Sequence, residues 1–196
     1  MLIQLSVIFI FLEMASIMAV LILPKFRWVI FALGIQYLAA FFLTFQTLSL
    51  GLALIKLLVG WMITALFASI STTVERRWNT EKALSGMILR ITVMVGLWII
   101  LYLATPTIKT WLPAPINSLI GGVFLISGGI IEFGLSNQVM RVCIGLLTLM
   151  SGFEVIYAVL EPSVMVSGLL ALVNIGIGLV GIFLIMRLEA DIEVVE

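Results

Sequence analysis

The sequence has no histidine, a single cysteine and few charges, and each shortage excludes a class of protein. Without histidine the chain lacks the commonest metal ligand and acid–base catalyst, so we expect no metal, no cofactor and no catalytic centre. Cys143 has no second cysteine with which to form an internal disulfide. Charged residues make up 10% of the chain, against about 25% in a soluble domain, which excludes a soluble protein. The formal net charge is zero, so nothing indicates a nucleic-acid partner.

What the sequence has instead is long hydrophobic runs. Hydrophobic residues make up 63% of the 196 positions, and a helix needs roughly 20 of them in a row to cross a bilayer. Because lipid cannot satisfy backbone amides, helices are the expected structure of such runs. The sequence therefore predicts an all-α polytopic membrane protein with about seven transmembrane helices, at residues 2–23, 28–46, 49–70, 86–104, 117–135, 141–160 and 163–187.

The first hydrophobic run is as long as a secretory signal peptide but lacks its other features. No basic residue precedes it, Glu13 interrupts it, and no small-residue cleavage site follows it. We therefore expect it to remain in the protein as the first span.

The basic residues predict the orientation of the spans. If the seven spans alternate, one side of the membrane receives eight Lys and Arg residues and the other receives only Lys109. The eight are Lys25, Arg27, Arg76, Arg77, Lys82, Arg90, Arg141 and Arg187. Since basic loops stay in the cytoplasm, we expect the N-terminus outside, the C-terminus in the cytoplasm, and a multi-pass location in the inner (plasma) membrane. The polar loop 71–85 is expected to form an interfacial turn with Trp78 at headgroup level.

Four ionisable side chains interrupt the hydrophobic runs: Glu13, Lys56, Glu132 and Glu154. A charge at the bilayer centre costs about 3 kcal/mol on insertion scales, so such residues usually serve a function. Counting about 1.5 Å per residue, Lys56 and Glu154 each lie roughly 10 Å from the outer ends of their helices. Their matched depths make an ion pair possible, whereas Glu13 falls near the middle of its helix without an evident partner.

We expect Lys56, Glu154 and Glu13 to belong to a proton path, because desolvation disfavours the charged form of such groups and favours proton exchange near neutral pH. The alternative is that these groups pair with one another, or with a partner subunit, and only fix helix packing. Glu132 is a weaker candidate, since it lies near the cytoplasmic end of its helix and is expected to reach the interface. Asn174, in the middle of the last span, joins the candidate path, although an interhelical hydrogen bond is its simpler role.

Small and polar residues elsewhere in the runs predict helix packing. Gln36 is expected to form a hydrogen bond between helices. The pairs Gly121-Gly122 and Gly128-Gly129, and the stretch Gly176-Ile177-Gly178, are expected to let helices approach closely. No repeat is recognised between the two halves of the sequence, and the helix-breaking prolines fall in the predicted loops.

Several stretches resemble small membrane subunits of respiratory complexes. Residues 136–141 (SNQVMR), 144–146 (IGL) and 174–179 (NIGIGL) resemble the K subunit of bacterial respiratory complex I, a protein of three helices, over about residues 117–187. Residues 53–59 (ALIKLLV) are similar to a lysine-bearing stretch in the N-terminal extension of the E component of hydrogenase-4 and formate hydrogenlyase complexes. That component joins such an extension to a K-like part, as this longer chain would.

The resemblance implies a division of the chain and a set of partners. Residues 1–104 would form a four-helix membrane extension, residues 117–187 a three-helix K-subunit-like region, and residues 188–196 a short acidic cytoplasmic tail. Besides the lipid bilayer, the partners would be larger antiporter-like and redox-module subunits of a membrane complex. The chain itself would be a non-catalytic subunit of a proton-translocating oxidoreductase.

The sequence also departs from the family that it resembles. The two intramembrane glutamates that relay protons in K-type subunits fall near Leu147 and Asn174, and neither is a carboxylate here. Glu154 lies two helical turns after Leu147 on roughly the same helix face, where it would substitute for the missing carboxylate. We predict a membrane-arm subunit of a complex I-like or group 4 hydrogenase-like assembly that contributes to proton translocation and packs antiporter-like subunits. The alternatives are a free-standing small transporter or channel, and a purely structural or assembly subunit.

Overall fold

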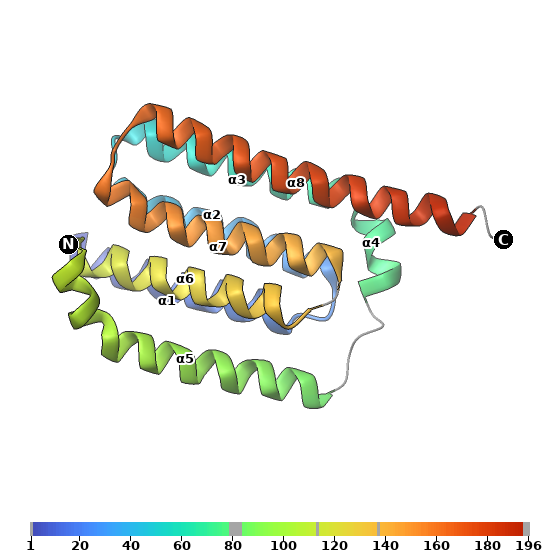
Figure 1. The fold of residues 1–196 in the computed structure, drawn as a ribbon, viewed down its shortest axis with the longest axis horizontal. Coiled ribbons are helices and arrows are strands. Elements are labelled where there is room, and N and C mark those ends of the chain that lie inside the picture. Colours follow the sequence, from blue (N-terminus) through green and yellow to red (C-terminus); the bar gives the residue numbers. More distant parts are fainter. Residues whose placement is uncertain (1, 79–83, 113, 137, 194–196) are drawn as a thin grey trace.

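The computed structural model describes residues 2–78, 84–112, 114–136 and 138–193, and the elements in these ranges are helices (Figure 1). In chain order they are α1 (Leu2–Ile22), α2 (Phe26–Phe45), α3 (Leu50–Ser69), α4 (Ser71–Trp78), α5 (Leu84–Trp111), α6 (Ile116–Gly134), α7 (Val139–Leu160) and α8 (Val164–Glu193). Lys82 and Asn137, which the sequence-based predictions used, lie outside the described residues.

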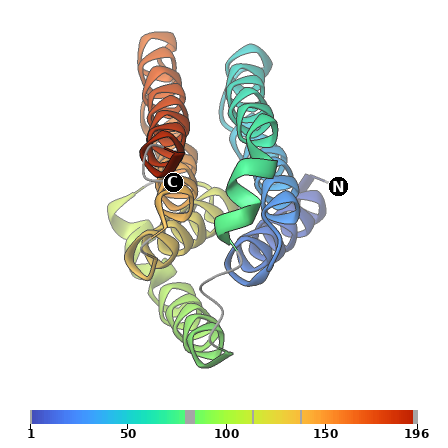
Figure 2. The same cartoon turned by 90° about the vertical axis from the view of Figure 1, so that its right-hand side faces the viewer.

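The long helices form two rows that pack against each other (Figures 1 and 2). In one row α2 contacts α1 and α3, and in the other α7 contacts α6 and α8. Across the rows α1 packs on α6, α2 on α7 and α3 on α8, and the two helices of each pair run in the same direction. The first three helices and the last three therefore repeat one arrangement. The sequence analysis recognised no repeat, and this repeated order of helix contacts was not predicted from the sequence.

The remaining long helix, α5, lies beside α1 and α6 at the edge of the rows (Figure 2). Each long helix runs between the same two ends of the molecule. We call the end where the chain begins the Leu2 end, and the opposite one, where α8 passes Arg187, the Arg187 end (Figure 1).

The described helices have the length and composition of membrane spans. Six of them are long and apolar enough to cross a membrane: α2, α3, α5 from Gly86, α6, α7, and α8 as far as Arg187. The residues Ser6–Ile22 of α1 form a shorter apolar helix. The prediction of an all-helical, multi-pass membrane protein is confirmed by these helices.

Two predicted span boundaries are wrong. α5 continues past residue 104 to Trp111 and includes Pro106, so this proline lies inside a helix and not in a loop. α8 continues past Arg187 to Glu193, so the beginning of the predicted acidic tail is helical. The residues Leu, Glu and Ala that follow Arg187 are good helix formers, which explains why the last helix does not stop where the hydrophobic run stops.

Glycines let α6 and α7 approach until their backbones touch. A Cβ atom on Gly129 would lie 2.6 Å from the carbonyl oxygen of Gly145, and one on Gly122 would lie 3.0 Å from the carbonyl oxygen of Gly152. The two contacts are seven residues apart on both antiparallel helices, so they fall on one face of each. Gly176 meets no atom within 4 Å, so the packing role expected of it is wrong.

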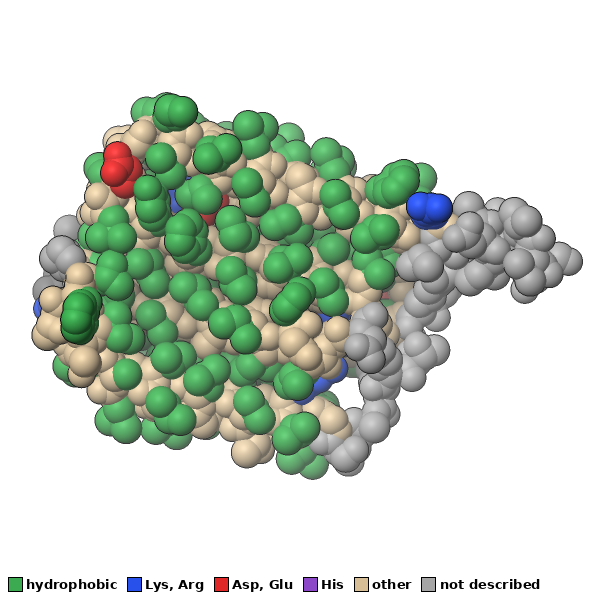
Figure 3. Space-filling model, viewed as in Figure 1, with side chains coloured by type: hydrophobic (Ala, Val, Ile, Leu, Met, Phe, Trp, Pro, Cys, Tyr) green, Lys and Arg blue, Asp and Glu red, His purple; other side chains and the backbone are tan. Residues whose placement is uncertain are grey.

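Hydrophobic side chains also cover most of the outer face shown in Figure 3. Large apolar residues are exposed along α5 and α8, among them Ile99, Leu103, Leu172 and Phe183. Apolar surface on this scale faces lipid or the apolar helices of other chains, because exposure to water would be unfavourable.

Candidate functional site

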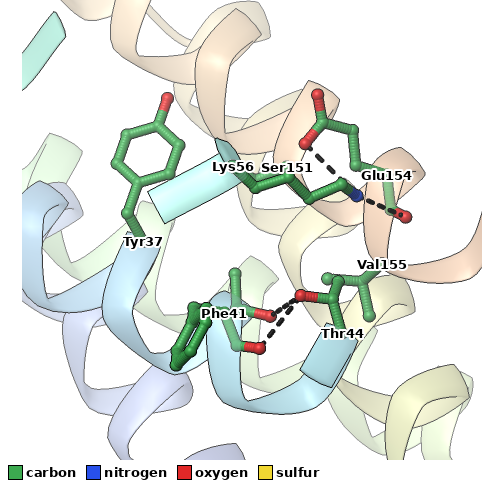
Figure 4. A pocket seen from close by; sticks show the side chains of 8 residues that line it. Tyr37, Phe41, Thr44, Lys56, Ser151, Glu154 and Val155 are labelled. Atoms are coloured by element: carbon green, nitrogen blue, oxygen red, sulfur yellow. Dashed lines mark hydrogen bonds and ion pairs between the residues drawn. The ribbon is translucent and has the colours of Figure 1, made fainter. Parts of the chain in front are cut away.

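Lys56, Glu154 and Asn174 meet in one buried cluster, although they lie on three different helices. The Lys56 ammonium lies 3.5 Å from Oε2 of Glu154 and donates a hydrogen bond of 3.0 Å to the backbone carbonyl oxygen of the same residue (Figure 4). Asn174 donates from Nδ2 to Oε1 of Glu154 over 2.7 Å. The ion pair suggested by the matched depths of Lys56 and Glu154 is confirmed, and Asn174 is added to it.

The cluster is almost closed to solvent. Glu154 is 6% exposed and Asn174 is 3% exposed, and the side chain of Lys56 is 12% exposed. A buried ion pair is favourable only where further hydrogen bonds satisfy its remaining donors and acceptors. Both carboxylate oxygens of Glu154 have a partner here, so the carboxylate meets that condition. Because Lys56 belongs to α3, Glu154 to α7 and Asn174 to α8, the cluster also joins the two rows.

A small cavity lies against the ion pair (Figure 4). The centre of a water molecule can occupy about 10 Å³ of it, which is room for roughly one water. Besides Lys56 and Glu154, its walls include Tyr37, Thr44 and Ser151. The Tyr37 hydroxyl is buried and makes no hydrogen bond of normal geometry within the described residues, although Ser151 lies close to it. The cavity thus offers several hydrogen-bonding groups to one water.

The sequence analysis did not select Tyr37, Thr44 or Ser151. Hydroxyl groups in apolar helices commonly bond to their own backbone, as Thr44 does to the carbonyl oxygens of Ala40 and Phe41 at 3.0 and 2.9 Å. Such residues therefore carry no compositional signal of a site. The one available signal was spacing, since Tyr37 and Thr44 are seven residues apart and so share a face of α2.

One more hydrogen bond between polar side chains lies next to the Lys56 cluster, toward the middle of the bundle. Gln36 donates from Nε2 to Oγ1 of Thr148 over 3.1 Å, which confirms its expected interhelical role. Beyond this bond, toward the Arg187 end, α7 presents the fully buried Leu147. α8 carries only apolar residues and glycines between Asn174 and Arg187. The polar residues that begin at the Lys56 cluster therefore end at a layer of apolar residues.

A second buried ion pair lies near the Arg187 end. Arg141 Nη1 lies 2.8 Å from Glu132 Oε1, and the guanidinium carbon lies 4.0 Å from the centre of the Trp78 ring. Both Glu132 and Trp78 are 2% exposed. One expectation is therefore wrong: Glu132 does not reach the interface, because the Arg141 cation attracts its carboxylate inward. The same cation stacks on the Trp78 ring, which is therefore buried within the protein, and the position of Trp78 at headgroup level stays a prediction.

Glu13 lies apart from both ion pairs, where α1 meets α6. A Cβ atom on Gly121 would lie 2.6 Å from Oε2 of Glu13, so the carboxyl group occupies the space which that glycine leaves free. Glu13 is 1% exposed, and neither carboxyl oxygen has a hydrogen-bond partner in the part of the chain that the structure describes. Ser16 donates to the backbone carbonyl oxygen of Glu13 at 2.8 Å. The structure therefore unites three candidate residues and leaves Glu13 alone.

The chemistry open to the Lys56 cluster is proton exchange. An ammonium and a carboxylate 3.5 Å apart, beside a cavity for one water, can release or accept protons without large movement. Within ranges 2–78, 84–112, 114–136 and 138–193, no three His, Cys, Asp or Glu side chains come together as a metal site would require. The cavity is also too small for an organic solute.

Comparison with known proteins adds no identification. No protein-family model, curated protein or solved structure matches the chain. The site's residues and the helix arrangement therefore carry the functional interpretation.

Proposed function

We propose that this chain is a membrane-arm subunit of a complex I-like or group 4 hydrogenase-like assembly, in which it contributes to proton translocation. The observation that carries the proposal is the buried cluster of Lys56, Glu154 and Asn174. Charges inside a membrane are costly, and those that are kept usually mark ion pathways. The resemblance of residues 117–187 to K-type subunits indicates the kind of assembly.

Seven spans of alternating direction fit such a subunit. α1 has 21 residues, which is enough to cross a bilayer, and it packs along α2 and α6. Lys109 belongs to the last turn of α5, which ends at the Leu2 end. The basic residues at the Arg187 end include Lys25, Arg27, Arg90, Arg141 and Arg187. By the positive-inside rule the Arg187 end is cytoplasmic, so the Lys56 cluster lies in the outer half of an inner (plasma) membrane.

In the proposed mechanism Glu154 is the proton-carrying group and Lys56 is its counter-charge. Protonation of Glu154 removes the negative charge that stabilises the Lys56 ammonium, so proton uptake at one group favours proton release from the other. Asn174 holds the carboxyl group in place. It stands where the resemblance expects a glutamate, so the neighbouring helix supplies the carboxylate in this chain. Glu13 would be a separate proton-binding group, and Glu132 is held by Arg141 outside the path.

Partner subunits of the assembly would cover part of the apolar surface. α5 contacts α1 and α6, and its other side carries exposed residues such as Ile100 and Leu103. Such a face suits antiporter-like neighbours made of apolar helices. Purification from native membranes should therefore recover the chain with larger membrane subunits, and stable isolation as a monodisperse single chain would count against the assembly.

The direct test is proton translocation by the native complex with Glu154→Gln or Lys56→Ala. Both variants should lose most proton translocation while the complex remains assembled. The matched controls are Glu161→Gln and Lys109→Ala, which remove exposed charges of the same types and should leave translocation unchanged. Normal translocation per assembled complex in Glu154→Gln, with lowered complex abundance, would overturn the proposal and favour a purely structural subunit.

One observation favours a second candidate, a free-standing transporter or channel. The Lys56 cluster lies between two three-helix units of the same order, and transporters built from repeats bind their ions at the repeat interface. The small cavity restricts such a transporter to protons or water. Reconstitution of the purified single chain in liposomes distinguishes the two candidates, since proton flux without any partner supports the transporter.

A further inference from the structure

The two three-helix units carry matching stretches around Lys56 and Asn174. Residues 53–60 (ALIKLLVG) align without a gap with residues 171–178 (ALVNIGIG), with identical residues at the first, second and last positions. At the third and seventh positions, one stretch has isoleucine where the other has valine. The two stretches lie on α3 and α8, which pack against each other across the rows. Lys56 and Asn174 therefore occupy equivalent positions in the two units, and both contact Glu154.

The helices before them align as well. Arg27 lies in the first turn of α2 and Arg141 in the first turn of α7. Both also contact α4, through the Arg27–Glu75 ion pair of 3.3 Å and through the Arg141–Trp78 stacking. Counting thirteen residues onward from each arginine brings Ala40 of α2 into register with Glu154 of α7.

The cavity supports this register independently. Ala40 is buried and lines the same cavity as Lys56, Glu154 and Thr44. α2 and α7 are the middle helices of their rows, pack against each other and run in the same direction. In such an arrangement equivalent residues of α2 and α7 face a common centre from opposite sides, as Ala40 and Glu154 do.

We propose that α1–α3 and α6–α8 are copies of one three-helix unit and form two related half-sites at their interface, of which only one has a carboxylate. Glu154 is the carboxylate of the half-site on α7, and Ala40 is its counterpart on α2. Lys56 and Asn174, the equivalent residues of α3 and α8, both serve the single carboxylate. The proton-binding role of that carboxylate rests on the function proposed above, whereas the equivalence of the two positions does not.

The first experiment moves the carboxylate across the interface. Glu154→Ala leaves Lys56 buried without a counter-charge and should lower the thermal unfolding temperature of the purified protein in detergent. Adding Ala40→Glu to Glu154→Ala should restore more than half of that loss, because the new carboxylate faces Lys56 from its own unit. Ala40→Gln with Glu154→Ala is the matched control, which has the same side-chain shape without the charge and should not restore stability. Equal unfolding temperatures of Glu154→Ala and both double variants would overturn the proposal.

The second experiment does not depend on whether a glutamate fits at position 40. Lys56→Asn removes the cation, and Asn174→Lys places a second cation against Glu154, so each single variant should lower the unfolding temperature. The double variant exchanges equivalent residues and should be more stable than either single variant. Strictly additive losses in the double variant would contradict the equivalence of the two positions.

Proton translocation by the same variants separates this proposal from the proposed function. If Glu154→Gln translocates protons normally, the proposed function fails, while the unfolding temperatures still decide the half-site proposal. If Glu154→Gln blocks translocation and Ala40→Glu with Glu154→Ala restores both stability and at least a tenth of the flux, both proposals are supported. Restored flux without restored stability would contradict the half-sites.

Discussion

The two buried ion pairs of this protein each join a basic side chain to a glutamate, but they lie in different settings. Glu132 and Arg141 lie on consecutive helices, nine residues apart in sequence, and a tryptophan covers the guanidinium. Lys56 and Glu154 are 98 residues apart and come from different three-helix units. Their pair borders a cavity for about one water and contacts an amide from a third helix.

The difference separates a structural pair from a candidate functional one. A short ion pair that is held by neighbouring helices and stacked on an aromatic ring fixes the end of the bundle. A longer pair beside a cavity and hydroxyl groups has what proton exchange requires. Both pairs are buried and join one cation to one carboxylate, so the surroundings of each pair and the kind of cation distinguish their roles, since arginine keeps its proton in proteins and a buried lysine can release one.

The largest expected effect comes from breaking the Glu132–Arg141 pair. Arg141→Ala leaves Glu132 buried without a counter-charge, so the free energy of unfolding in detergent micelles should fall by about 3–5 kcal/mol. Arg187→Ala, which removes an exposed arginine at the same end, is the control and should have little effect. Proton translocation per assembled complex should stay normal in both variants, and a specific loss in Arg141→Ala would place this pair in the path as well.

Neutral replacement of both partners sharpens the comparison. Glu132→Gln with Arg141→Met, and Lys56→Met with Glu154→Gln, each exchange a buried pair for uncharged groups of similar volume. Such exchanges leave the free energy of unfolding unchanged or raise it by about 1–4 kcal/mol. Proton translocation should survive the first exchange and disappear in the second. Equal translocation by the two double variants would remove the proposed difference between the pairs.

The α6–α7 contact, which frames Glu132 and Arg141, gives the next smaller effect. Gly129→Ala places a methyl group against the backbone of α7, and such overpacking should lower the free energy of unfolding by about 1–3 kcal/mol. Gly176→Ala is the matched control, because no atom lies within 4 Å of its Cβ position. Chemical denaturation in micelles measures both, and equal results would show that the helices separate without cost.

The exposed Arg27–Glu75 pair should give the smallest effect. Its atoms lie 3.3 Å apart, but its side chains are 65% and 25% exposed, so Arg27→Ala should cost at most about 1 kcal/mol of unfolding free energy. The same measurement on Arg141→Ala provides the comparison. A similar loss in the two variants would mean that burial does not explain the strength of the Glu132–Arg141 pair.

Much of the candidate site was predictable because depth in a membrane can be counted along a helix. Lys56 and Glu154 were matched by counting residues from the ends of their spans, and the structure joins them. The partner of Glu132 was not predictable in this way, since hydrophobicity does not show which face of a short span turns inward. Tyr37 and Ser151 were missed for a related reason, because hydroxyl groups are common and inexpensive inside apolar helices.

The sequence by itself determined the membrane class, the approximate spans and the residues that are costly in lipid, because these depend only on composition along the chain. The tertiary structure decided which helices are neighbours, which of the costly residues meet, and that two three-helix units face each other. The spans are apolar on nearly all sides, so their sequences contain little information about which side faces another helix and which faces lipid. Packing alone resolves that choice, and it brings Lys56, Glu154 and Asn174 together.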